Sequence, residues 1–225
     1  MTEHQPRQLA FDFPPGIALG PDDFFVSEAN RLAFAMLRTP GDWPEGKLVI
    51  TGPIGCGKSH LARVFHLQTG ARVIAASDLV DGPPPDGPIV VEDMENLPAA
   101  SETAMFHLHN HQRNIGQPLL MTSALPPARW PATLPDLVSR MQATTVAPID
   151  DPDDALLTVV ILKLFSDRQI VPPPNLAPYL AQRIERSFAA AADIVERLDK
   201  LAMAEGKDIS QRLAAALLDK PVDLE

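Results

Sequence analysis

One eight-residue loop constrains this chain more than any other feature. Residues 52–59 read Gly-Pro-Ile-Gly-Cys-Gly-Lys-Ser, and they join an apolar run to a helical pattern that starts at Lys58. In the pattern G-x-x-x-x-G-K-[ST], the glycines let backbone N–H groups surround phosphates, the lysine reaches the β- and γ-phosphates, and the hydroxyl holds Mg²⁺. The alternative is a glycine-rich turn without a ligand. The residues that we expect to bind a nucleotide are Gly52, Gly55, Gly57, Lys58 and Ser59.

Strand-like and helix-like segments alternate through the first two thirds of the chain. Short apolar runs predict strands at 47–52, 72–76, 88–93, 118–123 and 144–147. Helical spacing predicts helices at 30–37, at 58–68 and between Ser101 and Ile115, the last with Ser101 as its N-cap. This alternation predicts an α/β fold, in which a parallel five-stranded sheet is covered by helices on both faces.

After Pro148 the pattern changes to helices alone. Asp151 or Asp153 can cap a helix whose apolar residues lie between 156 and 165, and further helices are expected at 176–186, 188–205 and 211–219. We therefore expect three regions: an extended tail at 1–16, a nucleotide-binding αβα domain at 17–149 and a small all-α lid domain at 150–220.

Two acids follow the predicted strand at 88–93. Glu92 can hold Mg²⁺ or its water from the end of this strand, and its neighbour Asp93 can polarise an attacking water. The alternative is an acidic pair that caps a helix. Because the glycine-rich loop precedes this strand, we favour the catalytic interpretation, with Ser59 and Glu92 as the metal ligands.

Arg140 lies just before the last predicted strand, after a short helix. An arginine at such an edge can point out of its own subunit toward a neighbour's γ-phosphate, although a surface ion pair is the alternative. His107, His109 and His111 alternate in a predicted helix, and only His107 and His111 share a face. We expect solvated or half-buried histidines there and no metal site.

Composition limits the partners of the chain. Its 225 residues carry 19 basic and 29 acidic side chains, a net charge of −10 that argues against strong direct DNA binding. The single cysteine, Cys56, excludes an internal disulfide, and we expect it to be a small filler in the loop. No apolar run approaches the roughly 20 residues of a membrane helix, and the N-terminal residues lack an apolar signal core. We therefore expect a cytoplasmic protein that contacts no membrane and works through a protein partner.

These motifs together resemble the Hda-like AAA+ regulators, which are related to the replication initiator DnaA. Residues 25–33 look like the adenine-side box of that family, 52–60 match its Walker A motif, 91–93 its Walker B motif and 134–140 its arginine-finger box. In the tail, residues 8–13 look like the family's clamp-binding hexapeptide, although they could instead pack on their own domain. The tail residues that would enter a groove of the clamp are Gln8, Leu9, Phe11 and Phe13.

The resemblance implies a negative regulator of replication initiation. Such a protein would bind the DNA-loaded sliding clamp (the DNA polymerase III beta subunit) with ADP or ATP and Mg²⁺ bound. It would stimulate ATP hydrolysis by DnaA through Arg140 in trans. Two other functions are open: a helicase-loader-type AAA+ ATPase, which would need a basic, aromatic groove for single-stranded DNA, and a self-contained P-loop kinase, which would need a separate basic phosphate clamp.

Three positions depart from the family pattern. Glu92 stands where the family usually has Asp, Ala124 falls at the sensor 1 position, and Ala189 falls where we place the sensor 2 arginine. Arg186, one turn earlier, could substitute as a nucleotide contact. The two alanines predict weak or no intrinsic ATPase activity, so that the protein acts mainly as an activator of a partner ATPase.

Overall fold

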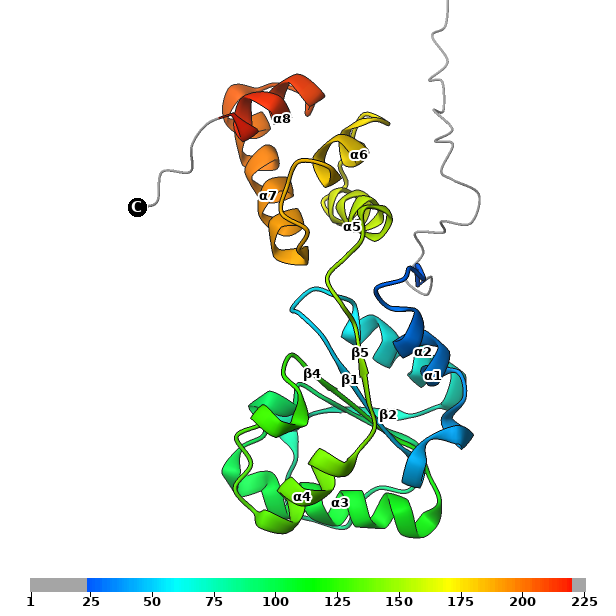
Figure 1. The fold of residues 1–225 in the computed structure, drawn as a ribbon. Helices are drawn as coiled ribbons and strands as arrows, with labels where there is room; N and C mark the ends of the chain where they lie inside the picture. The colour runs from blue at the N-terminus through cyan, green and yellow to red at the C-terminus, as the bar shows by residue number, and fades with distance from the viewer. Residues whose placement is uncertain (1–23, 220–225) are drawn as a thin grey trace, which may run out of the picture.

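The computed structural model describes residues 24–219, and its sheet has five parallel strands in the order β2-β3-β4-β1-β5 (Figure 1). The strands are β1 (Lys47–Thr51), β2 (Arg72–Ala75), β3 (Ile89–Glu92), β4 (Leu119–Ser123) and β5 (Val146–Pro148). Because the strands are parallel, their carboxyl ends all lie along one edge of the sheet and their amino ends along the opposite edge. We call the side at Thr51, Glu92 and Ser123 the carboxyl edge, and the side at Lys47, Ile89 and Leu119 the amino edge. The predicted α/β fold with a parallel five-stranded sheet is confirmed.

Side chains of β1 alternate between two buried layers. Leu48 and Ile50 pack in a cluster with residues of α1 (Arg31–Leu37) and α2 (Lys58–Thr69), whereas Val49 packs in a cluster with α3 (Glu102–Ile115) and α4 (Pro135–Ala143). Successive strand side chains point to opposite faces, so each face of the sheet is covered by its own pair of helices. The result is a three-layer αβα arrangement.

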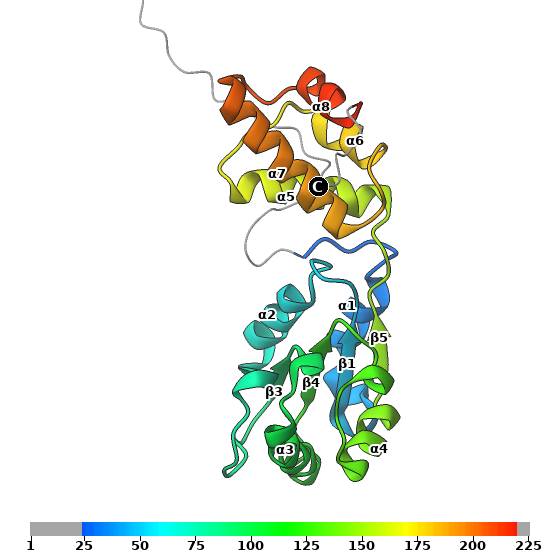
Figure 2. The same cartoon turned by 90° about the vertical axis from the view of Figure 1, so that its left-hand side faces the viewer.

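The chain after β5 is helical and has a core of its own. Its helices are α5 (Asp154–Asp167), α6 (Leu176–Ala181), α7 (Phe188–Glu205) and α8 (Gln211–Leu218). Figures 1 and 2 show them on the side of the carboxyl edge. We call residues 24–149 the α/β part and residues 150–219 the helical part; their division into independent domains stays a prediction. None of the described helices is long and apolar enough to cross a membrane.

Side-chain caps begin three of these helices. Asp153 Oδ1 accepts from the N–H of Leu156 at 2.7 Å, so Asp153 rather than Asp151 caps α5. Ser187 caps α7 and Ser210 caps α8 in the same manner. Each cap satisfies an N–H group that the helix itself leaves unpaired.

The structure differs from the predicted elements in two details. Ser101 is the N-cap residue of α3 as predicted, but its side chain makes no capping hydrogen bond, because the hydroxyl donates to the Leu79 carbonyl at 2.6 Å. The helix expected at 176–186 ends at Ala181. The chain tightens there, with the N–H of Arg183 donating to the Leu180 carbonyl, because it must turn before α7 begins.

Candidate functional site

The loop at residues 52–57 leaves β1 at the carboxyl edge and enters α2. Gly55 and Gly57 have φ values of 85° and 98°, in the left-handed region that favours glycine. Gly52 is required by packing, because a Cβ there would lie 2.8 Å from Cys56 Sγ and 2.9 Å from the Ile149 carbonyl oxygen. Backbone geometry or packing therefore calls for glycine at all three positions.

Lys58 begins α2 and is buried. Its Nζ donates to the carbonyl oxygens of Gly52 at 2.8 Å and Pro53 at 3.0 Å, which holds the ammonium against the loop. The N-cap residue Gly57 offers no side-chain acceptor, so the first N–H groups of α2 keep their partial positive charge toward the loop. Ser59 follows in the first turn and is exposed. An ammonium and a helix N-terminus at one loop suit an anion such as a phosphate.

Cys56 fills space inside the same loop. Its side chain is buried, and burial raises the pKa of the thiol. A thiol of raised pKa carries little thiolate, the reactive form. This agrees with the filler role expected from the sequence.

Two acidic residues stand at the carboxyl edge where β3 ends, with β4 between them and the strand that leads into the loop. Glu92 ends β3, and its Oε1 is buried without a hydrogen-bond partner among the described residues. Asp93 is exposed, and its N–H donates to Thr122 Oγ1 at 3.3 Å. A buried carboxylate oxygen without a donor is unfavourable, and a cation would supply the missing partner.

Glu95 is a third acid at this edge, and sequence reasoning missed it. Its Oε1 accepts from the N–H of Ala124 at 3.0 Å, and its Oε2 is buried without a partner in residues 24–219. Glu95 therefore places a carboxylate beside the backbone of Ala124, at the end of β4. The one signal was its place three residues after Glu92.

The donor set at this edge fits Mg²⁺. The ion prefers oxygen ligands and usually binds through one or two carboxylates plus substrate phosphates. Glu92 and the Ser59 hydroxyl would supply the protein ligands of such an ion. In the described part of the chain no group of three or more His, Cys, Asp and Glu residues could hold a metal by itself.

Two aromatic residues close over the loop, and neither was expected from the sequence. A Cβ on Gly55 would lie 3.2 Å from Phe188 Cβ, and one on Gly57 would lie 3.2 Å from Phe24 Cε2. Phe188 begins α7, so the helical part reaches the loop directly. Arg186, two residues earlier, is exposed and pairs with Asp154 at 3.0 Å.

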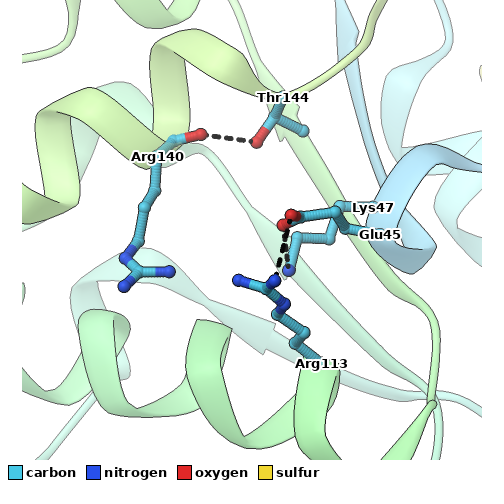
Figure 3. Close-up of polar contacts among 5 residues, drawn as sticks. All are labelled: Glu45, Lys47, Arg113, Arg140 and Thr144. Atoms are coloured by element: carbon cyan, nitrogen blue, oxygen red, sulfur yellow. Dashed lines mark hydrogen bonds and ion pairs between the residues drawn. The ribbon is translucent and has the colours of Figure 1, made fainter.

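Arg140 lies at the other edge of the sheet. It occupies the last turn of α4, and its Cζ lies 5.1 Å from the centre of the Phe106 ring on α3. No ion pair links its guanidinium to an acid within residues 24–219. Figure 3 shows the Arg140 side chain extending from α4 toward α3, close to Lys47, Glu45 and Arg113.

These neighbours share one carboxylate. Glu45 Oε2 pairs with Lys47 Nζ at 3.4 Å, and Glu45 Oε1 pairs with Arg113 Nη2 at 3.6 Å. Lys47 is the first residue of β1 and its side chain is only 2% exposed. Burial lowers the pKa of Lys47, and the Lys47 hydrogen bond and charge lower the pKa of Glu45. Both groups are therefore held as one pair at the amino edge.

His109 is buried beside this cluster, which corrects the expectation of solvated or half-buried histidines. It is 2% exposed, and burial, reinforced by the charges of Lys47 and Arg140, lowers its pKa to about 4. Its Nδ1 has no hydrogen-bond partner among the described residues. His109 follows the buried Met105 by four positions, so both lie on the face of α3 that packs on the sheet. His107 is exposed and His111 pairs with Asp86 at 3.0 Å.

Comparison with known proteins identifies the chain's relatives. No protein-family model matches it. DnaA of Porphyromonas gingivalis is 22% identical over 232 residues, which cover 90% of this chain and 49% of that DnaA. The crystal structure of domain III of Thermotoga maritima DnaA matches with a TM-score of 0.68 and 19% identity, over 90% of this chain and 98% of that one. This chain is therefore similar in sequence to part of DnaA and has the fold of DnaA domain III.

The likeness to DnaA domain III confirms the three-layer αβα fold that the sequence predicted. AMPPCP-bound DnaA from Aquifex aeolicus matches with a TM-score of 0.63 and 19% identity, over 89% of this chain and 70% of that chain. The chain spans about half the length of the curated DnaA relatives that it matches. The narrower Hda-like assignment stays a prediction. Its clamp-binding residues Gln8, Leu9, Phe11 and Phe13 lie outside the described residues.

Proposed function

We propose that this chain is an Hda-like regulator that stimulates ATP hydrolysis by the initiator DnaA, using Arg140 in trans. One observation carries the proposal. Arg140 lies at the amino edge near Lys47, the first residue of β1, whereas the glycine-rich loop follows Thr51 at the carboxyl edge. Five residues of β-strand separate the two edges by about 13 Å, at about 3.3 Å per residue. Arg140 therefore has no access to its own loop and is placed to serve another molecule.

The contacts of Arg140 leave its guanidinium available to a partner's phosphate. The guanidinium is held over the Phe106 ring rather than by a carboxylate, so its charge and hydrogen-bond donors stay available to an external anion. A guanidinium placed on a transferring phosphoryl group stabilises the charge that develops there. Such an arginine finger contributes on the order of 10³–10⁵ in rate in other phosphoryl-transfer systems.

The chain's own nucleotide would bind at the carboxyl edge. Gly52, Gly55, Gly57 and the N-terminus of α2 would surround the phosphates of ADP or ATP, and Lys58 would exchange the carbonyls of Gly52 and Pro53 for phosphate oxygens. Ser59 and Glu92 would hold Mg²⁺, and Asp93 would orient water. Support comes from the buried, unpaired Oε1 of Glu92 and from the AMPPCP-bound DnaA relative.

Hydrolysis at this site would be slow. Ala124 and Ala189 carry only methyl groups at the two sensor positions, and the N–H of Ala124 is already bound by Glu95. Arg186 is the candidate substitute for sensor 2, and it would have to leave Asp154 to contact a phosphate. The chain would then act mainly as an activator of its partner.

The sliding clamp would bring regulator and initiator together. In this proposal Gln8, Leu9, Phe11 and Phe13 enter a groove of the DNA-loaded clamp, and the acidic chain itself holds no DNA. Negative regulation follows, because DnaA that has hydrolysed its ATP would no longer initiate.

Arg140→Ala tests the proposal. The maximal rate of DnaA ATP hydrolysis on clamp-loaded DNA should fall about 10³-fold or more. Clamp binding of the variant should stay unchanged. Its melting temperature should fall by a few degrees at most, because Arg140 pairs with no acid in the described chain and loses only its contact with the Phe106 ring. Arg197→Ala, which breaks an exposed pair with Asp193 in the helical part, is the matched control and should keep full stimulation. Intact stimulation by the Arg140→Ala protein would refute the proposal.

A further inference from the structure

We propose that Arg113 is a second phosphate-binding arginine, which forms with Arg140 an anion site at the amino edge for the polyphosphate of a partner-bound nucleotide. The inference rests on the proposed function, since that function brings the partner's nucleotide to Arg140. It adds a residue that no motif singles out. It also assigns a role to the group of charges around Glu45.

Positive charge exceeds negative charge at this place. Lys47, Arg113 and Arg140 all act on the buried His109, and Glu45 is the one acid that does so among the described residues. Three cations and one carboxylate leave a local charge of about +2, with His109 neutral. The chain as a whole has a net charge of −10, so this excess runs against its general composition. An external anion would balance it.

Glu45 does not satisfy Arg113 fully. The Nη2–Oε1 distance is 3.6 Å, and the two side chains are 54% and 52% exposed, so the pair contributes little to stability. The same carboxylate also serves Lys47, whose ammonium is buried and depends on it. Arg113 can therefore exchange Glu45 for a phosphate oxygen at small cost, and a guanidinium–phosphate contact is stronger than an exposed ion pair.

Arg113 and Arg140 extend from neighbouring helices on the same face of the sheet, and both act electrostatically on His109. Figure 3 shows Arg113 extending from α3 toward Glu45, while Arg140 extends from α4 toward α3 on the same side of the sheet. Arg113 and Glu45 also line a surface cavity of about 350 Å³, whose other walls include Trp43 and Pro118 but not Arg140, so an anion would enter at Arg113. A polyphosphate has several oxygens along its length, so one ligand can contact two cations that stand on neighbouring helices.

The test compares variants of the full chain in the clamp-dependent DnaA hydrolysis assay. Arg113→Ala should lower the maximal stimulated rate by about ten- to a hundredfold, the loss expected for one charge-assisted hydrogen bond. The concentration of this chain that gives half-maximal stimulation should change less than about twofold. Arg113→Lys should recover part of the rate, and Arg197→Ala should match the wild type.

The outcomes separate this inference from the proposed function. Wild-type stimulation by Arg113→Ala, beside loss in Arg140→Ala, would overturn the role of Arg113 and leave the proposed function intact. If Arg140→Ala also stimulates fully, the proposed function fails. The anion site is then judged by calorimetry with inorganic tripolyphosphate, in a Lys58→Ala background that weakens binding at the glycine-rich loop. Binding that both Arg113→Ala and Arg140→Ala remove would keep the site, and binding that neither changes would overturn it.

Discussion

The two edges of the sheet bind charge in different ways. At the carboxyl edge the positive groups are mainly backbone N–H groups at the start of α2, with Lys58 held by two carbonyls. At the amino edge they are the side chains of Lys47, Arg113 and Arg140. Lys47 and Arg113 share the Glu45 carboxylate, whereas Arg140 lies over the Phe106 ring. The first arrangement is fixed by the main chain and by glycines. The second is held by side chains from β1, α3 and α4, and can rearrange.

This difference explains why one molecule would not complete a catalytic site. A fixed backbone cradle suits a nucleotide that stays bound, whereas long cationic side chains suit a phosphate that arrives with a partner and leaves again. β1 keeps the two edges apart, so in the proposed function one molecule would supply the nucleotide-binding loop and the other would supply the guanidinium. In this proposal the same fold can carry its own nucleotide and act on that of DnaA.

Acid pH should destabilise the amino edge, because His109 becomes protonated there. The pKa of His109 is lowered from 6.5 to about 4, so the fold favours the neutral imidazole. The associated stability is fully present above pH 6.5 and is lost as the pH falls toward 4. Over this interval the free energy of unfolding should decrease by about 3 kcal/mol, at about 1.4 kcal/mol per unit of pKa difference.

Denaturant unfolding at pH 7 and pH 4 measures this loss. His109→Gln removes the titrating group, so its unfolding free energy should depend less on pH by about the same 3 kcal/mol. His107→Gln is the control, because His107 is exposed on the same helix and should keep the wild-type dependence. Equal pH dependence in all three proteins would show that His109 does not stay neutral in the fold.

A single methyl group should disturb the carboxyl edge. Gly52→Ala places a Cβ 2.9 Å from the backbone oxygen of Ile149, so β1, the loop or the chain after β5 must shift. We expect a loss of about 2 kcal/mol in unfolding free energy, as for other overpacked sites. Gly41→Ala is the matched control, because no atom lies within 4 Å of its added Cβ. Equal stability of the two variants in urea would show that the loop is not tightly packed at Gly52.

The two edges also differ in how well the sequence predicts them. The loop at 52–59 is contiguous, and its glycine spacing and following helix are local features, so the sequence alone predicts it. The amino edge brings together residues 45, 47 and 140 from three elements with residues 109 and 113 of α3, and no spacing in the sequence predicts that these four elements meet. The burial of His109 could have been predicted in part, because His109 follows the buried Met105 by four residues on the same helix. The alternating histidines at 107 and 111 made it unclear from the sequence which of the three faces the sheet. Phe188 reaches the loop only through the packing of α7, which the sequence does not state.

Crossed variants test whether the edges are independent. Lys58→Ala should weaken ADP binding about tenfold or more, because it removes a charge-assisted phosphate contact. Arg140→Ala should leave ADP affinity within about twofold of the wild type, because it lies at the opposite edge. Calorimetric titration of ADP with Mg²⁺ measures both. Weaker ADP binding in Arg140→Ala would mean that the edges are coupled within one molecule.

The smallest expected effect concerns the ring that holds Arg140. A guanidinium over an aromatic face gains about 0.5–1 kcal/mol at an exposed site, so Phe106→Leu should lower the maximal stimulated rate of DnaA hydrolysis a few-fold. Phe106→Tyr keeps the aromatic face and should restore the rate. Leucine keeps most of the apolar volume that Phe106 packs against α4. If Phe106 served only in packing, any fall in the stimulated rate would come with a fall in the melting temperature. A few-fold fall in rate at unchanged melting temperature, with recovery in Phe106→Tyr, would show that the ring positions the guanidinium. The amino edge would then orient its arginine without a carboxylate, as the carboxyl edge orients Lys58 without one.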